Sequence, residues 1–258
     1  GDYVEFKEFF QMLTIMLSVF FMYRQIRNSN KQKEKEYDYK RKEKAVEMAV
    51  VFQKMLKEVS YIVGILEKTK IKEIYHDRIK FNELKEFDYE ELVSKFGKNT
   101  IREINGADML ETVSINDAAN LYIRYNYADE NFLKLCDGQE TEKISLFIMN
   151  DFFERKSRVL NKLEWFSMNF TSGLADESVV YQSLHQVYLS FVKLFHFEIS
   201  IKNKEGPKDK YYCNIIDLYR EWAEHYERAL ERETNAQREF EDKMNDNIRK
   251  TDKFSIKY

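Results

Sequence analysis

Proline and glycine are scarce in this sequence, which has one proline and seven glycines among 258 residues. Because proline breaks helices and glycine weakens them, their scarcity leaves few places where helical geometry must stop. Charged residues make up 34% of the chain and suit exposed helix faces, while the 43% apolar content is enough for a buried core. Disorder of the whole chain is therefore excluded. We predict an all-α protein.

Cysteine and the motifs of common enzymes are also lacking. Cys136 and Cys213 lie far apart and form no metal-binding spacing, so we interpret both as reduced core residues. Glycine-rich phosphate loops, G-x-S-x-G elbows and H-E-x-x-H helices are absent. The formal net charge of -3 comes without a concentrated basic excess. We therefore expect no cofactor, no metal and no nucleic-acid partner, and we favour a binding module over an enzyme.

An uncharged stretch from Phe9 to Tyr23 is the main apolar feature near the N-terminus. Acidic residues precede it and basic residues follow it, a pattern that would leave the rest of the chain in the cytoplasm. We predict a single-pass membrane anchor over residues 1–28, in which Phe9 to Tyr23 contacts membrane lipid. Two alternatives stay open, an interfacial helix and a helix buried between subunits, because polar residues such as Thr14 and Ser18 dilute one face.

Apolar residues recur at helical spacing through the rest of the chain. Residues 29–75 pass from a charge-dense tract into an apolar-periodic one, which predicts a long stalk helix that becomes the first helix of a bundle. Residues 76–250 are predicted to form a helical-bundle cytoplasmic domain. In it, one apolar stretch ends at Gly173, and Asp176 is placed to cap the next helix of a hairpin. A third helix is predicted from Asp209, with a charged distal half that projects from the core or pairs with the stalk.

The hairpin and the YYCNIIDLYREW segment carry a resemblance to a known family. The residues that carry it mostly cap or pack helices: Leu160, Asn161, Glu164, Gly173, Asp176, Glu177, Val180, Tyr181, Tyr211, Tyr212 and Trp222. In these positions the chain resembles an uncharacterised bacterial family of membrane-anchored helical proteins, a domain of unknown function. The resemblance implies an anchor helix followed by a helical cytoplasmic domain. Because some proteins of this general kind occur among phage-defence genes, it also suggests a role in phage defence or envelope signalling.

A polar strip on the second hairpin helix is a candidate partner surface. It consists of Tyr181, Gln182, His185 and Gln186, and a histidine there is also common at the edge of a core. We expect the helices to bind a protein partner or a second copy. The leading hypothesis is thus a membrane-anchored helical module for binding, sensing or assembly.

Two alternatives come from other classes of protein. Arg220 and His225 have the R-x-x-x-x-H spacing that resembles the active-site motif of helical ribonucleases, in which the histidine would act as acid or base and the arginine would hold phosphate. This would make the chain a ribonuclease or toxin-like effector, although the spacing is weak evidence by itself. Glu73 and His76 form a single E-x-x-H, whereas a di-iron bundle needs two. The second alternative is a soluble coiled-coil adaptor whose first helix is buried between subunits.

Overall fold

A computed structural model describes residues 12, 14–25, 34–75, 79–83, 85–126, 129–204 and 210–255. Within these ranges every regular element is a helix and there is no strand, which confirms the all-α prediction. After an N-terminal helix whose described part is residues 14–25, the elements are α2 (Glu34–Leu66), α3 (Lys70–Tyr75), η1 (Phe81–Glu83), α4 (Tyr89–Phe96), α5 (Lys98–Glu103), η2 (Gly106–Thr112), α6 (Ile115–Asn126), α7 (Glu130–Asp137), α8 (Thr141–Thr171), α9 (Glu177–Lys202) and α10 (Cys213–Ser255).

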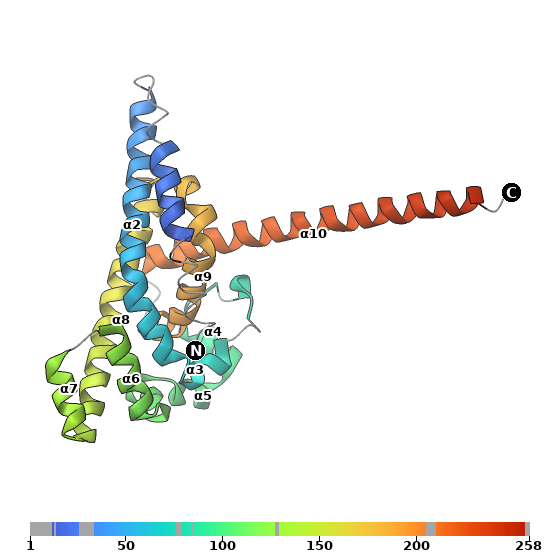
Figure 1. Cartoon of the computed structure of the whole chain (residues 1–258). Helices are drawn as coiled ribbons and strands as arrows, with labels where there is room; N and C mark the ends of the chain where they lie inside the picture. The colour runs from blue at the N-terminus through green and yellow to red at the C-terminus, as the bar shows by residue number, and fades with distance from the viewer. Residues whose placement is uncertain are drawn as a thin grey trace.

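Four long helices form the centre of the body. Both α2 and α10 pack against α8 and α9, and the short helices pack around them (Figure 1). The predicted cap at Asp176 is confirmed, because α9 begins directly after it and its carboxylate accepts a hydrogen bond from Ser178 N at 3.0 Å. Such a side-chain cap satisfies one of the free N–H groups in the first turn. The two helices of the hairpin are in contact where Ser167 Oγ of α8 lies 2.8 Å from Tyr188 Oη of α9.

The predicted single-pass anchor is wrong. Across the described ranges, no helix combines the length and the apolar character needed to cross a bilayer. In the N-terminal helix, Ile15 and Met22 are buried in the same hydrophobic cluster as the body, so this side of the helix packs against protein. The first part of the predicted anchor, residues 1–11, lies outside the described residues, as does His76 of the E-x-x-H pair.

The predicted stalk differs from the structure at both ends. Near its start, Arg41 is not a freely solvated stalk residue, because its Nε donates to Gly173 O at 2.9 Å in the turn between α8 and α9. At the other end α2 stops at Leu66, where Thr69 Oγ1 donates to Leu66 O at 2.6 Å and accepts from Ile71 N at 3.3 Å. One threonine side chain therefore both closes α2 and opens α3.

The last helix has two distinct halves. Its first turns are buried in the body, whereas residues 228–245 are exposed and the helix extends away as an arm (Figure 1). The arm projects and does not pair with the start of α2.

The two cysteines are not in the core, which corrects the prediction that both are core residues. Cys213, at the beginning of α10, is exposed, and Cys136 is only half-buried. Both thiols are free.

Candidate functional site

Tyr181 on α9 lies between two histidine rings. Its ring stacks on His185 at 4.5 Å between centroids and 13° between planes, and on His225 of α10 at 4.1 Å and 14°. His185 is held by a hydrogen bond between its Nδ1 and Tyr181 O, 2.7 Å apart, one turn back on the same helix. The structure thus brings together residues that the sequence placed in two separate hypotheses, the partner surface and the ribonuclease motif.

The stack rests on a tryptophan. Trp222 is fully buried, meets Tyr181 edge-on at 5.5 Å and 87°, and donates from its Nε1 to Glu177 Oε2 at 2.8 Å. Burial and the nearby Glu177 carboxylate raise the pKa of Tyr181. Among the described residues its hydroxyl has no hydrogen-bond partner. Gln182 and Gln186 are exposed beside this cluster.

The cluster is a packed surface without the geometry of an acid–base pair. Tyr181 separates the two imidazoles, and its raised pKa makes the phenol a poor base near neutral pH. Within the described ranges, no group of three His, Cys, Asp or Glu side chains is arranged to hold a metal ion. The stacked rings therefore join α9 to α10 by aromatic packing.

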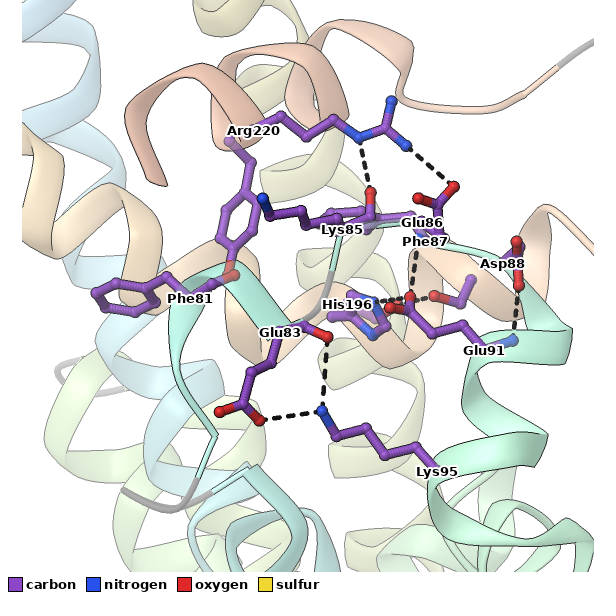
Figure 2. Close-up of polar contacts among 12 residues, drawn as sticks. Phe81, Glu83, Lys85, Glu86, Phe87, Asp88, Glu91, Lys95, His196 and Arg220 are labelled. Atoms are coloured by element: carbon purple, nitrogen blue, oxygen red, sulfur yellow. Dashed lines mark hydrogen bonds and ion pairs between the residues drawn. The ribbon is translucent and has the colours of Figure 1, made fainter. Parts of the chain in front are cut away.

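Arg220 faces away from this stack. Its Nε donates to Lys85 O at 2.7 Å, and its Nη2 lies 3.7 Å from Glu86 Oε2 (Figure 2). Five residues along an α-helix correspond to a rotation of about 140°, so Arg220 and His225 project in different directions from α10. The structure does not bring the guanidinium and the imidazole of the R-x-x-x-x-H spacing together.

The segment that Arg220 contacts is irregular, and we call its residues 79–83 and 85–88 the strap. Tyr219 donates from its hydroxyl to Phe81 O at 2.9 Å, so two successive residues of α10, Tyr219 and Arg220, hold the strap. Phe87 is fully buried at φ 52°, a left-handed conformation that is rare for a bulky residue. Its ring lies 4.5 Å from that of His196 and 5.3 Å from that of Tyr219, and this packing offsets the backbone strain.

No protein-family model matches this chain, and no curated protein or solved structure is similar to it. The resemblance drawn from the sequence therefore stays a prediction.

Under the strap lies a buried pair that the sequence analysis missed. His196 Nε2 is 3.1 Å from Glu91 Oε2, and the same oxygen accepts from Phe87 N at 3.1 Å (Figure 2). Burial lowers the pKa of His196, although Glu91 opposes that shift. Burial acts to raise the pKa of Glu91, but its bonds to His196 and to Phe87 N outweigh burial and lower it. Near neutral pH a neutral imidazole thus donates to an ionised carboxylate.

A second polar cluster is built around Arg155 of α8. Its guanidinium lies 5.0 Å from the ring centroid of Tyr61 and 5.7 Å from that of Tyr122, and its Nε is 2.8 Å from Asp151 Oδ2. Burial raises the pKa of Asp151 despite that ion pair. The i, i+4 spacing of Asp151 and Arg155 was visible in the sequence, but the two tyrosines come from α2 and α6, and no local pattern points to them.

Proposed function

We propose that this protein is a helical assembly module that pairs with a second copy of itself through the outward face of its N-terminal helix. The observation that carries the proposal is a set of large apolar side chains on that helix, each between 50% and 62% exposed. They are Met16, Leu17, Phe20, Phe21 and Tyr23. The largest apolar patch on a protein surface, typically about 300–600 Å², is often functional, whereas single exposed apolar residues are ordinary.

The N-terminal helix is apolar on two sides. Ile15 and Met22 are seven residues apart, about two turns, and face the body. The exposed apolar residues occupy the other side. Because the outward side of this helix is apolar as well as the side that faces the body, the outward face calls for a partner surface.

The patch is large enough for a specific contact between two copies. Side chains of this size bury roughly 150–250 Å² each, so five that are about half exposed offer on the order of 500 Å². Two copies related by a two-fold axis would then bury roughly 1,000 Å², near the lower end of specific interfaces. In such a pair each copy supplies the same patch, so no second surface is needed.

The arm of α10 is a weaker candidate for this contact. Its exposed apolar residues Leu230, Phe240 and Met244 are spread over about four turns. Glu233 and Gln237 interrupt the stripe between them, and polar residues at such positions lower the stability of helix pairing. The N-terminal helix, by contrast, presents five apolar residues within two to three turns.

The test is the mass of the full chain in solution, measured by light scattering across a wide concentration range. We expect a dimer that dissociates when Phe20→Glu places a carboxylate in the centre of the patch, because desolvating it in an apolar contact is costly. Asn120→Asp is the matched control, since it adds the same charge at an exposed position of α6, outside the patch. This variant should remain dimeric.

Three results would overturn the proposal. The first is a wild-type chain that is monomeric at all concentrations. The second is a dimer that survives Phe20→Glu but dissociates in Phe240→Glu, which would move the contact to the arm. The third is a monomer that co-floats with anionic lipid vesicles and loses this binding in Phe20→Glu, which would make lipid the occupant of the patch.

A further inference from the structure

A cavity of about 240 Å³ lies where α8 and α9 meet the short helices of the first half of the chain. Apolar side chains form most of its wall: Leu66, Ile71, Met109, Phe153, Phe195 and Ile201. These residues come from α2, α3, η2, α8 and α9, so the tertiary fold, and no single element, creates the space. A cavity lined in this way keeps water only if polar groups can hold it.

Three charged residues line the same cavity. Lys156 is only 8% exposed and forms an ion pair with Glu198 of α9. Lys202, one turn further along α9, lies with its Nζ 3.7 Å from the other oxygen of Glu198 and also donates to Tyr212 Oη at 3.2 Å. Two ammonium groups therefore share one carboxylate at the edge of an apolar space, which leaves one positive charge without an anionic partner in the cavity wall.

We infer that this cavity binds a monoanionic amphiphile of medium length, such as a straight-chain carboxylate. The apolar wall would take the chain, and the ammonium groups of Lys156 and Lys202 would receive the anionic head. The volume fits a ten-carbon chain whose head group stays at the cavity edge, because a cavity of about 150 Å³ holds benzene and 240 Å³ therefore holds roughly ten non-hydrogen atoms. A mostly apolar concave wall with a small number of polar or charged groups is the combination found in small-molecule sites.

Titration calorimetry on the full chain tests the site with three probes of equal chain length: decanoate, decanol and decyltrimethylammonium. We expect decanoate to bind saturably with one molecule per chain and at least about tenfold more tightly than decanol, because a charge-assisted hydrogen bond contributes that much. The cation should not bind. Equal affinity for all three probes, or uptake without saturation, would show simple partition into apolar surface and overturn the inference.

Variants locate the site. Lys202→Met removes a charge from the cavity edge at a partly exposed position, so the fold should persist, and decanoate should bind about tenfold more weakly. Lys204→Met is the matched control, because Lys204 lies two residues on, over the ring of Tyr89 at 4.7 Å, and does not line the cavity. Equal loss in both variants, or loss of binding in Phe20→Glu, would place the ligand elsewhere and refute the assignment.

Discussion

Glu91 and His196 are 105 residues apart in the sequence, yet the carboxylate of one lies 3.1 Å from the imidazole of the other. The pair joins α4 to α9, and the carboxylate also accepts from the backbone of Phe87 in the strap. The neutral, fully buried imidazole of His196 thus hydrogen-bonds the ionised carboxylate of Glu91, and this carboxylate accepts a hydrogen bond from the strained backbone at Phe87. The protonation state of two side chains is therefore coupled to the local fold.

This pair should make the protein sensitive to mild acid. Because the pKa of His196 is lower in the folded state, the unfolded chain takes up a proton first as the pH falls below about 6.5. Stability is therefore lost on acidification, by up to about 2 kcal/mol between pH 7 and pH 5 from this one group. The lowered pKa of Glu91 acts in the same direction at lower pH, beginning near 4.5. Urea unfolding at pH 7, 6 and 5 measures the first effect.

Two variants isolate the contribution of His196. In His196→Gln the side-chain amide can still donate to Glu91 but does not titrate, so most of the loss between pH 7 and pH 5 should disappear. His225→Gln removes an exposed histidine from α10 and should leave the acid sensitivity in place. Identical pH profiles for the wild type and His196→Gln would contradict this account.

Local signals were enough to predict the helical hairpin, and they failed wherever distant residues decide the structure. Gly173 and Asp176 predicted the turn between α8 and α9 because a cap acts within one turn of its own chain. Thr69 ends α2 through its own hydroxyl, but it stands in a tract whose composition favours a continuing helix. For the N-terminal helix, composition showed that it is apolar, whereas only the fold shows that Ile15 and Met22 are covered by protein.

The ion pair between Asp151 and Arg155 predicts that the effects of their substitution on the free energy of unfolding are strongly coupled. Arg155→Met should lower the free energy of unfolding by about 3 kcal/mol, because it leaves the largely buried Asp151 carboxylate without its cation. The double variant Asp151→Asn with Arg155→Met should recover at least half of that loss. Urea unfolding of the wild type, the two single variants Asp151→Asn and Arg155→Met, and the double variant gives the coupling energy, and equal stability of Arg155→Met and the double variant would show that the ion pair does not matter.

Arg220 and His225 allow a direct test of the ribonuclease alternative. Because Arg220 is engaged with Lys85 O, Arg220→Gln should cost about 1 kcal/mol of stability by loosening the strap. His225→Ala should have a smaller effect, since it removes one exposed ring from the stack on Tyr181. We expect no cleavage of labelled RNA by the wild type. Cleavage that disappears in both variants would restore the ribonuclease hypothesis.

The arm of α10 should be the least protected long helix in hydrogen exchange. Residues 228–245 are exposed, so tertiary packing does not protect their amides from exchange. Their protection comes only from the helical hydrogen bonds that continue from the buried turns. We expect a gradient in which amides around Trp222 exchange slowly and those beyond Leu230 exchange fast. Amides in the arm that exchange as slowly as those around Trp222 would indicate that a partner covers the arm.

Charge spacing at the root of the arm gives a way to alter that gradient. Glu227 lies three residues after Glu224 and four before Glu231, so it repels carboxylates on both sides. Glu227→Lys converts both repulsions into attractions and should slow exchange in the first turns of the arm about threefold, whereas Glu227→Gln, which only removes the repulsion, should give a smaller change. Both effects should shrink at high salt, because pairs between exposed charges are screened. A slowing that persists unchanged in high salt would mean that helix propensity, and not charge, sets the stability of the arm.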